Sequence, residues 1–164
     1  MKPILDRHEK VLRDTAKEVL IKEIPSVKIQ KILADMKEAL ASQDDGIAIA
    51  APQIGVSLRI FVVSGRVMNI IKGEDETVPY PDMVFINPVI TKLSKEKKAM
   101  EEGCLSVRYL YGKVRRSTKA SIEAYDEQGN FFKKGVSGLM AQVFQHETDH
   151  LNGILFIDSA TELE

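Results

Sequence analysis

The stretch SGLMAQVFQHETDHLNG, residues 137–153, carries both a helix signal and a cluster of metal-binding side chains. Ser137 belongs to the residue types that cap helices, and the pair Asn152-Gly153 is typical of a helix end. Between them, apolar residues recur at helical spacing and form one apolar side: Leu139, Met140, Val143, Phe144 and Leu151. We therefore expect a C-terminal helix that packs this side into a core.

The same stretch contains an H-E-x-x-H motif, His146 to His150. On a helix the two histidines lie four residues apart and face the same way, so both imidazoles can bind one ion. Glu147 emerges about 100° further round the helix, which suits a general acid/base rather than a third ligand. The alternative is a solvated helix face with chance His and Glu residues, but two of only three histidines in the chain stand at ligand spacing.

A catalytic metal site usually has three protein ligands and an open position. In thermolysin-like proteases the third ligand is a Glu on a later helix, but only Glu162 and Glu164 follow here. Cys104, the single cysteine, lies in EGCLS beside a glycine, and we expect strand residues around it. A lone Cys is more often a small buried residue, and a cysteine hydrolase would use it as nucleophile. Only a metal site uses all four residues at once.

Outward from this helix, the chain predicts an α+β fold in one domain, residues 1–164, with antiparallel β-sheets packed around the C-terminal metal-binding helix. A first helix should start at Ser26, after Pro25, because apolar residues follow at helical spacing. We expect a surface loop at Ser64–Asp82, which has several Gly and Pro residues. Strands are predicted at residues 58–63, 84–93, 97–107, 119–125 and 131–136, with a hairpin loop at 126–130.

Composition narrows the class of protein. A formal charge of −1 gives no general attraction to nucleic acid or to an anionic membrane, and no apolar run is long enough to span a bilayer. A single cysteine cannot form an internal disulfide, and the N-terminus has both charge signs and no continuous apolar stretch. We therefore expect a cytoplasmic protein without nucleic-acid or membrane partners.

The segment GIAIAAPQ, Gly46 to Gln53, is small and apolar up to one amide side chain. Such a composition lets a substrate backbone lie close to the chain, and Gln53 can donate to a developing oxyanion. A tight connection with an exposed Gln is the alternative, and the segment alone favours it.

Three segments in this order, GIAIAAPQ, EGCLS and QHETDH, together resemble peptide deformylase, whose pattern is G-x-G-x-A-A-x-Q, E-G-C-x-S and Q-H-E-x-D-H. The resemblance implies hydrolysis of the formyl group from N-terminal formylmethionine of new polypeptides, with release of formate. It implies one divalent ion on Cys104, His146 and His150: Fe(II) in the cell, with Zn(II), Ni(II) or Co(II) in purified protein. Gln53 and the backbone N–H of Leu105 would hold the oxyanion, and Glu147 would carry the proton. The partners would be nascent chains at the ribosome exit, and the enzyme a monomer.

Substrate-binding residues are expected on both sides of the ion. Leu139, Gln142 and Val143 stand seven, four and three residues before His146, so they share its helix face. We expect Leu139 and Val143 to form an apolar wall for a Met side chain, with Gln142 narrowing the pocket or binding water. Gly46, Ile47, Ala48 and Gly103 complete the predicted substrate-binding set.

The chain departs from the family pattern in two motif positions. Ala48 replaces the second Gly of the first motif, which adds a methyl group and disfavours a positive φ. Arg108 stands where many members have Pro. Two alternatives therefore remain at this point: an H-E-x-x-H endopeptidase with its third ligand near Glu162, and a formyl-peptide binder whose catalysis is weakened by Ala48.

Overall fold

The computed structural model describes residues 1–164. It has helices α1 (Val27–Ala41), α2 (Arg66–Lys72) and α3 (Gly138–Leu151). Its strands are β1 (Ala48–Ala50), β2 (Ile60–Val63), β3 (Met83–Leu93), β4 (Lys97–Glu102), β5 (Gly112–Ser117), β6 (Lys119–Tyr125) and β7 (Phe131–Ser137). Short 3-10 turns lie at Lys10–Arg13, Ile21–Glu23, Ala51–Ile54 and Phe156–Asp158.

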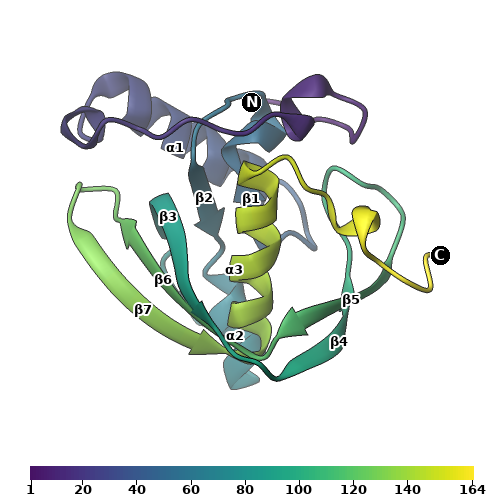
Figure 1. The fold of residues 1–164 in the computed structure, drawn as a ribbon. Coiled ribbons are helices and arrows are strands. Elements are labelled where there is room, and N and C mark those ends of the chain that lie inside the picture. Colours follow the sequence, from purple (N-terminus) through teal and green to yellow (C-terminus); the bar gives the residue numbers. More distant parts are fainter.

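The strands form two sheets that flank α3. Five strands pair antiparallel in the order β1-β2-β3-β6-β7, and β4 pairs antiparallel with β5. Helix α3 runs between the larger sheet and the β4–β5 pair (Figure 1). The predicted α+β class, with antiparallel sheets around the C-terminal helix, is confirmed.

Alternation along the strands explains why the larger sheet has a helix on each face. In β2, Ile60 and Val62 join the buried cluster that contains the inner side of α1, whereas Phe61 and Val63 join the cluster around α3. On the α3 side Phe61 stacks on Phe85 with ring centroids 4.7 Å apart, and Phe144 meets Phe85 edge-on at 5.0 Å. This aromatic contact fixes α3 against the sheet.

The predicted helix starts differ in how they are capped. At α1 the predicted start is confirmed, because Ser26 is the N-cap and its Oγ accepts a hydrogen bond from the Ile29 N–H at 3.3 Å. At α3 the expected cap by the Ser137 side chain is wrong, since Ser137 is the last residue of β7 and makes no capping bond. The chain passes directly from strand to helix there, and the helix ends as predicted at Asn152, followed by Gly153 at φ 75°.

Three strand and loop predictions need correction. The expected loop Ser64–Asp82 contains α2, whose seven residues are too few for a periodic apolar signal. The strand expected over residues 97–107 ends at Glu102, because the chain turns at Cys104, where Val107 N–H donates to the Cys104 carbonyl. Strand β5 was not predicted, since its sequence GKVRRS has one apolar residue.

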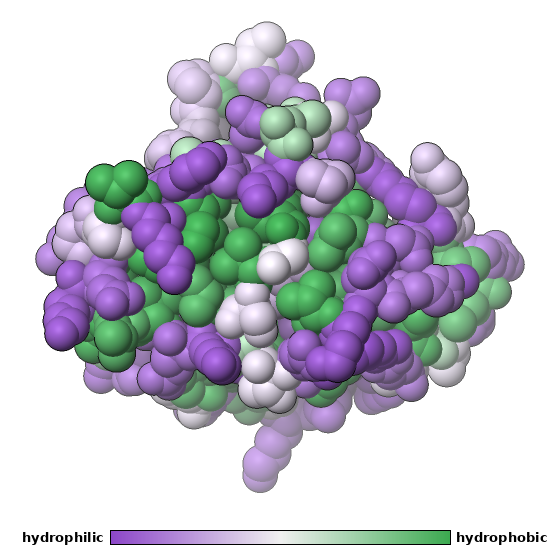
Figure 2. Space-filling view, turned by 90° about the horizontal axis from the view of Figure 1, so that it is seen from above, coloured by the Kyte–Doolittle hydropathy of each residue, from purple (hydrophilic) through white to green (hydrophobic).

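No helix combines the length and the apolar character that crossing a membrane requires. Seen from above, apolar residues gather in the middle of one face and hydrophilic residues surround them (Figure 2). Single exposed apolar side chains such as Leu20 and Val27 are ordinary on a protein surface.

Candidate active site

Helix α3 and the end of β4 bring the three predicted ligands together. His146 and His150 lie one turn apart on α3, and Cys104 follows two residues after β4. One ligand atom from each residue lies within 4.8 Å of the others, and Cys104 Sγ is 3.2 Å from His150 Nε2. A thiolate with two imidazoles is a donor set that suits Zn(II) or Fe(II).

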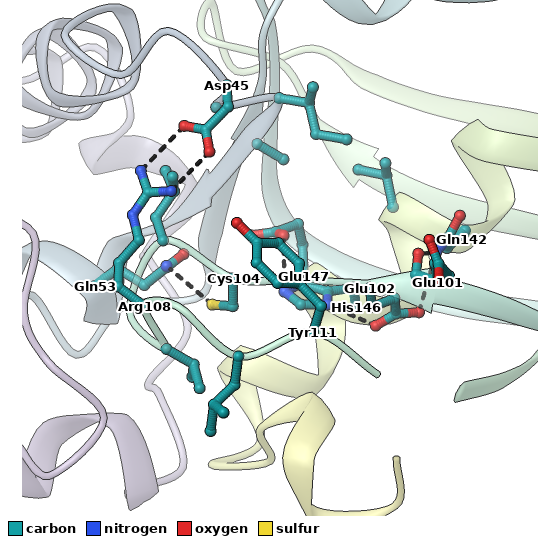
Figure 3. Close-up of a pocket in the computed structure, with 18 of the residues that line it drawn as sticks. Asp45, Gln53, Glu101, Glu102, Cys104, Arg108, Tyr111, Gln142, His146 and Glu147 are labelled. Carbon is teal, nitrogen blue, oxygen red and sulfur yellow. Dashed lines mark hydrogen bonds and ion pairs between the residues drawn. The ribbon is translucent and has the colours of Figure 1, made fainter. Parts of the chain in front are cut away.

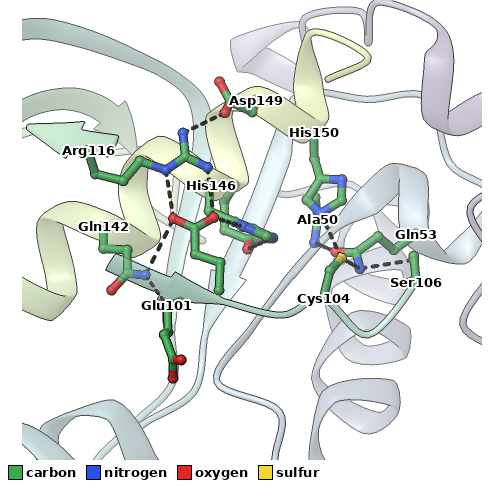
Figure 4. A network of polar contacts seen from close by, with 12 residues as sticks. Ala50, Gln53, Glu101, Cys104, Ser106, Arg116, Gln142, His146, Asp149 and His150 are labelled. Atoms are coloured by element: carbon green, nitrogen blue, oxygen red, sulfur yellow. Dashed lines mark hydrogen bonds and ion pairs between the residues drawn. The ribbon is translucent and has the colours of Figure 1, made fainter. Parts of the chain in front are cut away.

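The orientation of His146 is fixed by a buried network that the sequence did not predict. His146 Nδ1 donates to Glu102 Oε1 at 2.8 Å, which leaves Nε2 free to bind a cation. Arg116 donates to both Glu102 oxygens at 2.7 and 2.8 Å and to Asp149 at 2.7 Å (Figure 4). Glu102 is the one buried residue of β4, and Arg116 is a buried charge in the largely buried β5. Nothing in the sequence distinguishes these two residues from the other charged residues of their strands.

The surroundings of Glu102 and Cys104 favour the negatively charged forms of both side chains. Burial alone would raise the pKa of Glu102, but hydrogen bonds from Arg116 and His146 lower it to about 2. Burial would also raise the pKa of the Cys104 thiol, yet the neighbouring His150 and His146 bring it well below its ordinary value. A thiolate is the ligand form of cysteine, so Cys104 is prepared for a cation.

Glu147 lies in the same cluster but has a different environment. Its side chain is 4% exposed, its Oε1 has no hydrogen-bond partner, and Oε2 lies 3.7 Å from His146 Nε2. Burial, the largest influence, raises the pKa of this carboxyl above its ordinary value. A buried carboxyl with an unused oxygen and a raised pKa is suited to proton transfer.

Gln53 and Leu105 border the ligands from the opposite side. The Gln53 amide oxygen accepts from the Ala50 N–H at 2.8 Å, which turns its Nε2 toward Ser106 Oγ at 3.1 Å and Cys104 Sγ at 3.6 Å. Gln53 is 1% exposed, so the alternative of an exposed Gln is wrong. Leu105 directly follows the ligand Cys104 and lines the same cavity.

A cavity of about 410 Å³ opens onto Cys104, His146 and Glu147. It is lined by every residue of the predicted substrate-binding set: Gly46, Ile47, Ala48, Gly103, Leu139, Gln142 and Val143. Gln142 Nε2 donates to the Glu101 carbonyl at 2.8 Å, which holds its amide against the end of β4. Figure 3 shows Arg108 and Asp45 at one end of the cavity and Glu101 with Gln142 at the other.

The two departures from the family pattern are accommodated by their surroundings. Ala48 lies in β1 without a positive φ, so its methyl group causes no backbone strain. Arg108 donates to both oxygens of Asp45, at 2.6 and 3.0 Å, and to Gln43 Oε1 at 2.8 Å. This ion pair joins the segment before Gly46 to the segment after Cys104, and both segments form walls of the cavity. The sequence did not predict the pair, since its partners lie 63 residues apart.

Glu162, the third ligand of the endopeptidase alternative, lies outside the ligand cluster. Its carboxylate pairs with Lys113 Nζ at 3.1 Å, and its side chain is 66% exposed. The cluster consists of Cys104, His146 and His150. The endopeptidase alternative therefore lacks its ligand.

Known proteins match the whole chain. The family model described as polypeptide deformylase covers residues 1–164. A curated relative, the peptide deformylase of Psychrobacter cryohalolentis, is 40% identical over 162 residues, which are 99% of this chain and 80% of the relative. The Met-Ala-Ser-bound class I type b peptide deformylase of Acinetobacter baumannii matches with a TM-score of 0.82 at 32% identity, over 95% of this chain and 97% of that chain. The Synechococcus elongatus peptide deformylase in complex with actinonin matches with a TM-score of 0.81 at 31% identity, over 97% and 78% of the two chains. As the three sequence motifs predicted, the chain belongs to the polypeptide deformylase family.

Proposed function

We propose that this protein hydrolyses the formyl group from the N-terminal formylmethionine of newly made polypeptides and releases formate. The observation that carries the proposal is the meeting of Cys104, His146 and His150 beside the buried Glu147, at a cavity that reaches Cys104, His146 and Glu147. The family membership and the relative solved with Met-Ala-Ser, a peptide that begins with methionine, support the substrate class.

Cys104, His146 and His150 would hold one divalent ion, Fe(II) in the cell, with Zn(II), Ni(II) or Co(II) as substitutes in purified protein. Such an ion supplies Lewis acidity that activates water at neutral pH. The Glu102 carboxylate binds His146 Nδ1, so Nε2 would be the atom that holds the ion, and the lowered pKa of Cys104 keeps its sulfur in the thiolate form that binds metals.

Three further residues transfer the proton and stabilise the oxyanion of the reaction: Glu147, Gln53 and Leu105. Glu147 accepts the proton of the attacking water and passes it to the amine nitrogen of methionine as the formyl carbon–nitrogen bond breaks. Gln53 Nε2 and the backbone N–H of Leu105 stabilise the negative charge that develops on the formyl oxygen. The products are formate and a free N-terminal methionine.

The cavity walls fit an extended peptide that begins with an unbranched side chain. The Ile47 carbonyl accepts from the Ser64 N–H on the β2 side, so antiparallel alternation directs the backbone groups of Ala48 away from β2, toward the open edge. A peptide can add along this edge. Leu139 and Val143 then provide an apolar wall for methionine, and Gly103 lies in the wall of the same cavity.

We further propose that residues 1–164 act as one catalytic domain and as a monomer in the cytoplasm, on chains that leave the ribosome. Formylmethionine occurs at the start of new chains, so the substrate itself places the reaction there. A reducing compartment also preserves the Cys104 thiolate. The formal charge of −1 supports no direct binding to nucleic acid.

The test is formate release from formyl-Met-Ala-Ser by the purified metal-loaded protein and by Glu147→Gln. The variant should keep its ion, because Glu147 is not a ligand, and should lose about 10² to 10⁴ in rate with the proton carrier. Glu76→Gln, the same change on an exposed side chain outside the cavity, is the control and should keep the rate. No formate from the wild-type protein would refute the function, and an unchanged rate in Glu147→Gln would assign the proton transfer elsewhere.

A further inference from the structure

Tyr111 forms a wall of the cavity that neither the motifs nor the metal chemistry assigns. Its ring lies directly on the backbone of Gly103: a Cβ on that glycine would come within 2.7 Å of two ring carbons, Cδ1 and Cε1. The residue is 49% exposed and lines the cavity beside Cys104. Figure 3 shows the ring in front of Glu147. An aromatic face at a cavity mouth is well suited to contact a peptide as it leaves the site.

The backbone around Tyr111 is held by the segment Thr161–Glu164, which we call the strap. Tyr111 N–H donates to the Glu164 carbonyl at 3.0 Å, and the Glu164 N–H donates to the Tyr111 carbonyl at 2.9 Å. Two residues on, Lys113 and Thr161 exchange the same pair of bonds, both at 2.8 Å. Gly112 lies under the strap, since a Cβ there would be 2.9 Å from Leu163 Cδ2 and 3.0 Å from the Thr161 carbonyl oxygen.

No other segment forms backbone hydrogen bonds with Tyr111. Pairing between β4 and β5 begins at Gly112 opposite Glu102, so Tyr111 lies just outside this sheet, at the end of the connection that carries Cys104. A segment with few backbone hydrogen bonds opens at a low free-energy cost. The strap therefore decides whether the ring stays on Gly103.

We propose that Tyr111 is a positioning residue that contacts the formyl-peptide substrate where it leaves the cavity, and that the strap Thr161–Glu164 holds it in place. The proposal rests on the proposed function, since it names a further contact of the same cavity. It predicts that the strap, which contains none of the metal ligands, controls the affinity for substrate and leaves the chemical step unchanged.

Kinetics test the coupling with three variants: truncation after Ala160, Tyr111→Ala, and both changes together. Each should raise KM for formyl-Met-Ala-Ser roughly five- to tenfold, the effect of losing about one aromatic contact, with kcat and metal content unchanged. The double variant should be no worse than Tyr111→Ala, because the strap acts through the ring. Tyr111→Phe and Glu162→Gln keep the ring and the strap backbone, so both should behave as wild type.

A second measurement does not depend on activity. The chain has no tryptophan, so Tyr111→Trp places a single fluorophore in this wall. Truncation after Ala160 in this background should shift the emission to longer wavelength and raise the acrylamide quenching constant. Gly112→Ala displaces the strap without shortening the chain, so it should cause the same shift and the same rise in the quenching constant. It replaces the truncated protein in this experiment if that protein does not fold.

The outcomes separate the two proposals. A wild-type protein that releases no formate refutes the function, while the fluorescence still shows whether the strap holds residue 111. Formate release with unchanged KM and unchanged quenching in the truncated and Gly112→Ala proteins overturns the strap. The proposal is also overturned if the increase in KM of the double variant equals the combined effects of the truncation and of Tyr111→Ala. The strap would then act on substrate binding without the ring.

Discussion

Glu102 stands between the metal site and the rest of the protein. Its side chain is 3% exposed, and it accepts from His146 on one side and from Arg116 on the other. A buried carboxylate is tolerated only with such partners, and removing it leaves the Arg116 guanidinium buried without a full counter-charge. The position of the His146 ring and the stability of the fold therefore depend on the same carboxylate.

Glu102→Gln should lower the free energy of unfolding by about 3 kcal/mol at pH 7. The pKa of Glu102 is lowered on folding, from 4.5 to about 2, so its carboxylate stabilises the fold above pH 4.5, and this contribution is lost as the pH falls toward 2. The difference between wild type and variant should therefore shrink in acid. Denaturant unfolding from pH 7 to pH 3 in the presence of a chelator measures it, with exposed Glu101→Gln as control. A difference that stays constant down to pH 3 would contradict this assignment.

Cys104→Ser should remove most of the bound metal. A neutral hydroxyl binds Zn(II) or Fe(II) much more weakly than a thiolate does, while the volume of the side chain hardly changes. Metal analysis after anaerobic purification gives the content, and thermal unfolding shows whether the variant is still folded. Ser106→Ala, two residues away, is the comparison variant and should keep its ion. Full occupancy in Cys104→Ser would show that the ligand cluster is assigned incorrectly.

The reactive residues were predictable because their chemistry is local or rare. His146 and His150 share one helix face, and Cys104 is the only cysteine of the chain. Glu102 and Tyr111 were not predictable, because Glu and Tyr are common residues whose role here depends on contacts across the fold. Their partners, Arg116, Gly103 and the strap, lie in other segments that only folding brings close.

Among the elements, helix α3 contacts both the hydrophobic core and the candidate active site. Phe144 packs on the sheet, and His146 faces the ligand cluster, while Val143 belongs to the core and also lines the cavity. A change on the cavity side of this helix therefore alters the space for substrate without moving the metal ligands.

Filling that space with Val143→Phe should slow hydrolysis of formyl-Met peptides more than that of formyl-Ala peptides, with unchanged metal content. One methylene contact is worth about 1 to 3 kcal/mol, so a change in preference is expected rather than complete exclusion. The ratio of the kcat/KM values for the two substrates is the measurement. Val143→Ala, the opposite change in volume, should favour longer side chains. Equal slowing of both substrates by Val143→Phe would place Val143 outside the methionine pocket.

Most elements that bury apolar residues in a run or at regular spacing were predicted. Helix α1 and strand β6 bury apolar residues at regular positions, and β2 and the first half of β3 contain buried apolar runs, so their sequences show their structure. Strand β7 has no buried residue and was predicted together with the hairpin loop before it. Strand β5 is stabilised by pairing with β4 and with the strap, and α2 is enclosed by two glycines. Both depend on neighbours more than on their own pattern.

For the whole molecule, metal binding and folding should be linked. Cys104 and His150 are 46 residues apart in sequence, and the ion site exists only when α3 lies against the end of β4. An ion that binds only the folded chain adds about 2.7 kcal/mol at a hundredfold excess over its Kd, which raises Tm by roughly 5 to 11 °C. Chelation should therefore lower the Tm of the wild-type protein and leave that of Cys104→Ser unchanged. Equal shifts in both proteins would mean that the ion binds elsewhere.

The fold class could be inferred from the order of helices and strands, but the assembly of the cavity could not. Its walls come from segments before β1, after β4 and along α3, and the Arg108–Asp45 pair that joins two of them is visible only in three dimensions. A single sequence shows which residues are reactive, whereas the space between them is a property of the whole chain.

The position of strand β1 also bears on self-association of the protein. It is an edge strand with one side unpaired, and such edges are where β-proteins aggregate, because any exposed strand of another molecule can add to them. Here the edge is three residues long and lies at the wall of a cavity, so a neighbouring sheet cannot reach it, whereas a single flexible chain end can. The recess thus protects the protein from self-association at the same place where it would admit its substrate.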